Sequence, residues 1–222
     1  MNLPTPWLWA VLAPLLVIVG LAGLHSVPIV FAVYHVGLCL LLPAVSSRSR
    51  GLSWREHAQQ LGLVRRGLAS GAMLGVLSAA LPVMAFVVRP DLFPDAESLH
   101  EALAGWSLDP AAPGAMILFM GLINGPAEEL FWRGWLQGQL MRGPVGGAVL
   151  VLLFSSYHVL TIGTLAPSPG GVVLMLAGVL GAASFWTWSR HRWGSVWPAV
   201  LSHAGGTAGY MAVCWRVLVE QP

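Results

Sequence analysis

Three ionisable side chains, Glu128, Glu129 and Arg133, lie inside one otherwise apolar stretch of the sequence, PAEELFWRGW. An ionisable group at the centre of a bilayer costs about 2.5–3.5 kcal/mol even on lenient insertion scales, and is kept when it is paired, hydrated or functional. Glu129 and Arg133 are four residues apart with the acid first, the favourable order for an ion pair along a helix. Glu128 then has no local cation, which makes it a candidate general base. The alternative is one structural network of all three residues with a partner elsewhere.

Two histidines, His158 in FSSYHVLT and His203 in SHAGGTAG, lie in two further apolar stretches. A single histidine in such a stretch is usually a packing or hydrogen-bonding group. Two histidines and a spare carboxylate on three helices can instead converge on a polar cavity, which is how helical bundles build sites. His35 is a weaker candidate because no companion motif accompanies it.

Several known ways of cleaving a peptide bond inside a membrane do not fit this sequence. A zinc site of the H-E-x-x-H type fails because the only His-Glu pair, His100-Glu101, is followed by Ala104 at the fifth position. An aspartyl pair fails because all three aspartates lie in the polar segment 89–113, and no G-x-S-G tetrapeptide supplies a serine nucleophile. What remains is a set of one glutamate and two histidines.

The amino-acid composition indicates the environment in which these residues lie. Of 222 residues only 9% are charged and 56% are hydrophobic, and the mean hydropathy is +0.73. An ordinary soluble domain has about 25% charged residues, so this chain cannot cover a soluble surface. Soluble enzymes, nucleic-acid binders and disordered chains are thereby excluded. The composition predicts an all-α polytopic membrane bundle, formed by a single membrane domain over residues 1–222.

Seven apolar stretches are long enough to be membrane spans, since one span needs about 20 residues. A kink or break is expected in the fourth stretch, at Pro126. The two cysteines lie inside apolar runs and predict no disulfide. The predicted spans are residues 7–24, 28–45, 68–88, 114–141, 144–162, 171–189 and 195–219.

The charges between the spans are sorted by sign. Segment 46–67 carries five arginines and one acid, whereas segment 89–113 carries five acids and one arginine. The positive-inside rule then predicts a cytoplasmic N-terminus and a C-terminus outside. Segment 46–67 is either an amphipathic helix on the membrane surface or a solvated basic loop. Glycine pairs four residues apart predict close helix packing in lipid at Gly71/Gly75, Gly143/Gly147 and Gly205/Gly209.

Three motifs in the C-terminal half, about residues 114–210, resemble those of the CPBP family. This family comprises type II CAAX prenyl proteases and bacteriocin-processing or bacteriocin-immunity (Abi) proteins. Residues 128–133 match its E-E-x-x-x-R motif, Phe154 to His158 match F-x-x-x-H, and His203 to Thr207 match the first half of H-x-x-x-N/D. Each motif is weak alone, but the three occur in the family's order, each on its own apolar stretch.

The resemblance implies an intramembrane endopeptidase that cleaves a membrane-associated protein or peptide near its anchored terminus. Glu128 would activate water with help from His158, while His203 and its partner four residues later, Thr207, would stabilise the oxyanion. We favour this metal-free catalysis. Members are described both as glutamate-dependent proteases and as metalloproteases, so zinc held by Glu128, His158 and His203 is the alternative. Glu129, Arg133 and Phe154 would support the site.

Thr207 departs from the family pattern, which has Asn or Asp at this position. A threonine hydroxyl donates one hydrogen bond but is shorter than an amide and can bond back to its own helix. The oxyanion role is therefore either weaker or carried by another donor. The candidates are Asn124, one turn before Glu128, and Ser202.

Two other functions remain open: a non-catalytic immunity or scaffold protein of the same fold, and a small transporter or proton relay. No internal repeat of the kind found in many transporters is visible. The arginines outnumber lysines by 11 to none, which suggests a high-GC bacterial genome and hence a bacterial inner membrane. Secreted peptides with a leader, or proteins with a C-terminal sorting anchor, are then the expected substrates.

Overall fold

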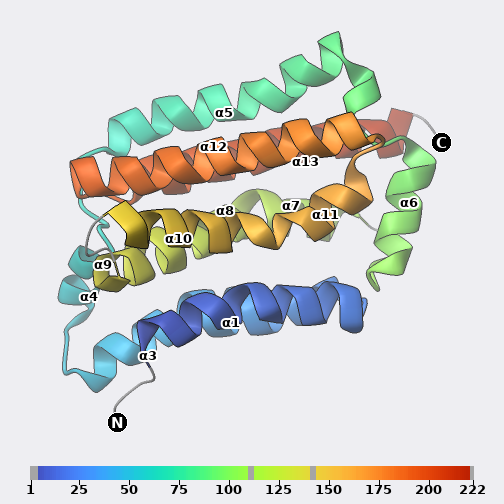
Figure 1. The fold of residues 1–222 in the computed structure, drawn as a ribbon. Coiled ribbons are helices and arrows are strands. Elements are labelled where there is room, and N and C mark those ends of the chain that lie inside the picture. The colour runs from blue at the N-terminus through green and yellow to red at the C-terminus, as the bar shows by residue number, and fades with distance from the viewer. Residues whose placement is uncertain (1–4, 110–112, 141–143, 221–222) are drawn as a thin grey trace.

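The computed structural model describes residues 5–109, 113–140 and 144–220, and every regular element among them is a helix (Figure 1). The N-terminal half contains α1 (Pro6–Ile18), η1 (Val19–Gly23), α2 (Val27–Val30), η2 (Phe31–Leu41), α3 (Leu42–Ser49), α4 (Trp54–Gln60), α5 (Leu68–Val88), η3 (Pro90–Leu92) and α6 (Ala96–Gly105). The C-terminal half contains α7 (Gly114–Phe119), η4 (Met120–Asn124), α8 (Gly125–Glu129), η5 (Leu130–Leu136), α9 (Gln137–Leu140), α10 (Pro144–Ser156), α11 (His158–Leu165), α12 (Pro169–Trp193) and α13 (Trp197–Glu220).

The protein is an integral membrane helical bundle, but its predicted count of seven spans is not established. Within the described residues, five helical stretches are long and apolar enough to cross a membrane. Helices also occupy the fourth and seventh predicted ranges, yet their glycines and their polar residues, among them Glu128 and His203, lower the hydropathy there. The five stretches are Pro6–Gly23, Val27–Ser49, Leu68–Val88, Val145–Leu165 and Pro169–Trp193.

The two oppositely charged segments lie at opposite ends of the bundle. Figure 1 shows α4, from the basic segment 46–67, at one end and α6, from the acidic segment 89–113, at the other. This separation is what the predicted topology requires. Within segment 46–67, α3 ends at Ser49, and Trp54–Gln60 forms a separate short helix. This helix begins with a capping box in which Ser53 and Glu56 bond each other's backbone N–H groups.

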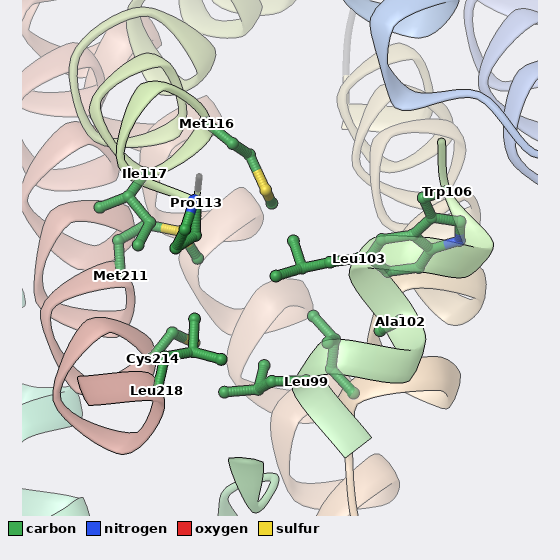
Figure 2. A pocket seen from close by; sticks show the side chains of 11 residues that line it. Leu99, Ala102, Leu103, Trp106, Pro113, Met116, Ile117, Met211, Cys214 and Leu218 are labelled. Carbon is green, nitrogen blue, oxygen red and sulfur yellow. The ribbon is translucent and has the colours of Figure 1, made fainter. Parts of the chain in front are cut away.

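Helix α6 covers one end of the bundle. It begins at Asp95, whose carboxylate accepts a hydrogen bond from the Ser98 backbone N–H over 2.9 Å. Leu99 packs with Met211 and Cys214 of α13 around a small apolar cavity of about 30 Å³ (Figure 2). After the helix, the Ser107 hydroxyl donates to the His25 carbonyl over 2.8 Å. The segment from α6 to Ser107 therefore joins α13 to the connection between the first two spans.

Small residues allow α5 and α13 to pack with their backbones in contact. A Cβ atom added to Gly205 would collide with the backbone carbonyl oxygen of Gly75, and one added to Gly209 would collide with that of Ala79. On the opposing helix, a Cβ on Gly71 would lie 2.8 Å from the Trp197 carbonyl oxygen. The glycine pairs at 71/75 and 205/209 thus form the predicted close packing, whereas the pair at 143/147 lies partly outside the described residues. Close approach of this kind supplies the van der Waals contact that holds helices together in lipid.

We expect Gly205→Ala to destabilise the protein by about 1–3 kcal/mol, because the added methyl group forces α5 and α13 apart. Thermal unfolding of the purified protein, followed by tryptophan fluorescence, measures the change. Gly181→Ala on α12 is the matched control, since a Cβ there meets nothing within 4 Å. Equal melting temperatures for the two variants would contradict the packing described above.

Candidate active site

The three ionisable residues at 128–133 lie on a helix with two unusually wide turns. Residues Met120–Asn124 and Leu130–Leu136 are π-helical, with i→i+5 hydrogen bonds, and the short α-helix α8 lies between them. Pro126 is in the first turn of α8, directly after the first wide turn. Because proline lacks an N–H group and clashes with the carbonyl four residues earlier, a disturbance was expected there. It takes the form of a change in helix type, which is frequent at functional sites.

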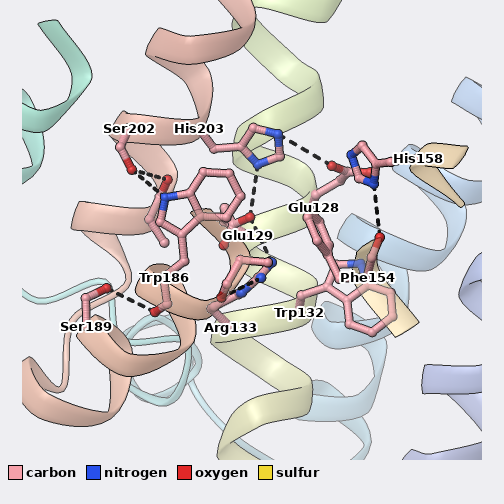
Figure 3. A network of polar contacts seen from close by, with 12 residues as sticks. Glu128, Glu129, Trp132, Arg133, Phe154, His158, Trp186, Ser189, Ser202 and His203 are labelled. Atoms are coloured by element: carbon pink, nitrogen blue, oxygen red, sulfur yellow. Dashed lines mark hydrogen bonds and ion pairs between the residues drawn. The ribbon is translucent and has the colours of Figure 1, made fainter. Parts of the chain in front are cut away.

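Glu129 and Arg133 form the predicted ion pair, and a histidine joins it. Arg133 Nη1 donates to Glu129 Oε1 over 3.0 Å, and His203 Nδ1 lies 2.9 Å from the same oxygen (Figure 3). Both residues of the pair are at most 2% exposed. A buried pair is stable only when further hydrogen bonds satisfy its atoms. Accordingly, Arg133 Nη2 also donates to the Ala183 carbonyl over 3.2 Å.

Aromatic rings enclose this ion pair. The Arg133 guanidinium lies 4.2 Å from the centre of the Phe154 ring and 5.3 Å from that of Trp186, within the range of cation–π attraction. The imidazole of His203 stacks on Trp186, with ring centres 4.5 Å apart. Phe154, the first residue of the second sequence motif, therefore supports the arginine rather than facing lipid. Arg133 is enclosed and is not presented to a ligand.

Glu128 is the acid that has no arginine partner. It is 2% exposed, and its Oε1 accepts a hydrogen bond from the Tyr157 hydroxyl over 2.7 Å. His35 Nε2 lies 3.9 Å from Oε1, and His203 Nε2 lies 3.7 Å from Oε2. Within the described part of the chain, Oε2 has no hydrogen-bond partner. One oxygen of this carboxylate is therefore held, and the other is available to a ligand.

His158 reaches the same region from another helix. Its Nδ1 lies 3.0 Å from the Phe154 carbonyl oxygen, so that nitrogen carries the proton and donates. In the neutral ring the other nitrogen, Nε2, is then an acceptor. The ring stacks on that of Tyr157, with centres 4.5 Å apart. Tyr157 lies between α10 and α11, so the interruption of the helix there brings two adjacent side chains to Glu128.

A cavity of about 480 Å³ connects these groups. It is lined mainly by apolar side chains, and none of the described residues that line it is a lysine, an arginine or an aspartate. Among the residues expected from sequence to act in catalysis or in its support, it brings together Glu128, His158, His203, Thr207, Asn124, Phe154 and Ser202.

The two alternative oxyanion donors differ in how they are bonded. The Ser202 hydroxyl accepts from Trp186 Nε1 over 2.7 Å and donates to the Pro198 carbonyl, so its only proton is already used within α13. Asn124 Oδ1 lies 2.6 Å from His35 Nε2, which leaves the amide N–H groups of Asn124 as donors. Asn124 therefore remains a candidate, whereas Ser202 is poorly placed for this role.

Sequence reasoning missed Tyr157 and Tyr34 and undervalued His35. The site uses Tyr157 directly, while Tyr34 Oη lies 2.9 Å from Tyr157 Oη. His35 is 3% exposed and contacts both Glu128 and Asn124. All three lie in apolar spans, where a tyrosine or histidine has few partners. Such a polar group in a span is itself a signal of a buried hydrogen bond.

The zinc alternative requires Glu128, His158 and His203 to converge on one point. Across residues 5–109, 113–140 and 144–220, no group of three or more His, Cys, Asp and Glu side chains is arranged to hold a metal ion.

A comparison with known protein families finds a match in the C-terminal half of the chain. Residues 110–208 match the family model of type II CAAX prenyl endopeptidase Rce1-like proteins. No curated protein and no solved structure matches the chain. The matched segment contains Glu128, His158 and His203, whereas Tyr34 and His35 lie outside it.

We expect Arg133→Met to destabilise the protein by about 3–5 kcal/mol, since it leaves Glu129 buried without its counter-charge. The double variant Glu129→Gln/Arg133→Met should recover much of that loss, because no uncompensated charge remains. Thermal unfolding and the yield of folded protein in the membrane measure both effects. Arg89→Met, which breaks the exposed pair with Asp91, should change stability little. A mild effect of Arg133→Met would show that the pair is not needed for folding.

Proposed function

We propose that this chain, an integral membrane protein with an Rce1-like protease domain in residues 110–208, is an intramembrane endopeptidase. Its substrate is a membrane-associated protein or peptide, cleaved near the anchored terminus. The carrying observation is Glu128, a buried carboxylate with one oxygen bonded by Tyr157 and the other unpartnered beside a large cavity. A carboxylate with a free oxygen beside a cavity can accept a proton from a bound water and so act as a general base.

In the proposed reaction, water lies between Glu128 Oε2 and His158 Nε2. Both atoms are acceptors, so the water donates its two hydrogens to them and directs a lone pair at the scissile carbonyl carbon. Glu128 removes one proton as the C–O bond forms. It then returns the proton to the peptide nitrogen as the C–N bond breaks. Atoms and charge balance with one water consumed and a new carboxyl and amine terminus produced.

The tetrahedral intermediate carries a negative charge on the former carbonyl oxygen. His203, bonded at Nδ1 to Glu129, can donate from Nε2 when it is doubly protonated, and Thr207 can donate its hydroxyl proton. Donors aimed at this developing charge supply a large part of the catalysis in such sites. The Glu129–Arg133 pair acts indirectly, by fixing the position of His203.

The cavity also restricts the substrate. Its lining is mainly apolar and carries no lysine or arginine among the described residues, so it provides no permanent positive charge for a free carboxylate. An internal, apolar peptide segment suits this lining better than a charged chain end. We place the protein in a bacterial inner membrane with its N-terminus in the cytoplasm, and we expect leader-bearing peptides or proteins with a C-terminal sorting anchor as substrates.

Glu128→Ala should reduce cleavage by about 10²–10⁴-fold or abolish it, because the general base is lost. Comparison of membrane proteomes from cells with wild-type protein and with the variant should reveal proteins that keep uncut termini. Glu97→Gln, at an exposed position in the first turn of α6, is the control. The variant must accumulate to the wild-type level for the comparison to count.

The same comparison separates the alternatives. Identical termini in both strains, with the variant folded, would contradict the protease and favour a non-catalytic membrane protein. A chelator that stops cleavage in isolated membranes would contradict the metal-free mechanism while leaving the protease intact.

Thr207 provides a second test of the mechanism. Thr207→Val preserves the shape but removes the hydroxyl proton, and kcat should fall about 10²–10³-fold if this donor faces the oxyanion. Thr207→Asn restores a donor and should keep activity near the wild-type level. Rates are measured on a substrate found by the proteome comparison. A fully active Thr207→Val enzyme would transfer the role to Asn124.

A further inference from the structure

A row of three aromatic side chains leads through the protein interior to Glu128. Trp132 Nε1 donates to Tyr34 Oη over 3.0 Å, Tyr34 Oη lies 2.9 Å from Tyr157 Oη, and Tyr157 donates to Glu128 Oε1 over 2.7 Å. Trp132, Tyr34 and Tyr157 are between 1% and 4% exposed. Trp132 lies in η5, Tyr34 lies in η2, and Tyr157 lies at the junction of α10 and α11.

The groups at the two ends of this row, the Trp132 indole and the Glu128 carboxylate, determine the direction of every hydrogen bond in it. An indole N–H only donates, and an ionised carboxylate only accepts. Tyr157 uses its single proton on Glu128, so it must accept from Tyr34. Tyr34 in turn accepts from Trp132. All three bonds therefore point toward the carboxylate, and each polarises the next.

We propose that Tyr157 is a positioning residue for Glu128, oriented by Tyr34 from the second span. It holds Oε1 and leaves Oε2 directed at the cavity as the proton acceptor. The proposal rests on the proposed role of Glu128 as general base. Because Tyr34 lies outside residues 110–208, it makes the N-terminal half a part of the active site.

A neutral donor suits this position better than a cation. Three histidines, His35, His158 and His203, face Glu128 from η2, α11 and α13, and Arg133 is paired with Glu129. An arginine bonded to Glu128 would neutralise the carboxylate and, in a bidentate contact, would also hold both of its oxygens. A tyrosine hydroxyl orients the carboxylate with one bond and adds no charge. With tyrosine as the partner, Glu128 is fixed in position and its negative charge is not neutralised.

The first test observes the carboxylate directly and needs no substrate. Infrared difference spectra at one pH, wild type minus Glu128→Gln in lipid nanodiscs, isolate the carboxylate bands of Glu128. With the donor removed in Tyr157→Phe, the asymmetric stretching band should move to higher wavenumber, and Tyr34→Phe should move it less in the same direction. Tyr210→Phe, whose hydroxyl makes no hydrogen bond with Glu128 in the described structure, should leave the band in place. An unshifted band in folded Tyr157→Phe would overturn the proposal.

The second test uses a substrate identified by the proteome comparison. Tyr157→Phe should lower kcat about 10- to 100-fold, the effect of one hydrogen bond to a charged group, with little change in KM. Thr164→Val, which removes an exposed hydroxyl of α11 that is bonded to its own helix, should leave both constants unchanged. A raised KM with unchanged kcat would make Tyr157 a substrate contact and refute the positioning role. If Glu128→Ala leaves cleavage intact, the proposed function fails, but the infrared result still decides whether Tyr157 orients the carboxylate.

Discussion

The cost of an unsatisfied charge inside a bilayer is the constraint on which the rest of this structure depends. Lipid cannot solvate a carboxylate, so each one requires partners from the protein itself. Glu129 obtains Arg133 and His203, and these contacts tie the fourth helical stretch to α13. Glu128 obtains a tyrosine and the proximity of histidines instead. Among the described residues, each glutamate keeps one oxygen without a hydrogen-bond partner, but Glu129 is paired with an arginine, whereas Glu128 has no arginine partner and lines the cavity.

Helix geometry makes this difference possible. In a regular α-helix adjacent residues point about 100° apart, which alone would send Glu128 and Glu129 to different neighbours. π-helical turns lie on both sides of α8, with Asn124 at the end of the first and Arg133 within the second. Gly125 completes the arrangement, since a Cβ there would lie 2.9 Å from the Ala204 backbone nitrogen. The absence of a side chain at this position lets the histidine of α13 approach both glutamates.

The fold and much of the candidate site could be predicted from the sequence because lipid leaves few choices. Apolar length located the helices, and the spacing of Glu129 and Arg133 indicated an ion pair that is present in the structure. The number of spans was less certain, because the helices that carry the polar residues also lose apolar character. His35 was undervalued because its partner, Asn124, is 89 residues away in the chain. Tyr34 and Tyr157, separated by 123 residues, could not be paired by any local pattern.

The sequence by itself determined the class of protein, the order of the helices and the short-range pair at 129 and 133. It also showed that Glu128 has no ion-pair partner on its own helix, since four-residue spacing is enough to recognise such a partner. Only the tertiary structure decided which oxygen of Glu128 is held, which histidines face it and which residues of the N-terminal half take part. These outcomes depend on contacts between helices far apart in the chain. Their distances are set by glycine contacts, wide turns and ring packing acting together, and none of these follows from spacing along one helix.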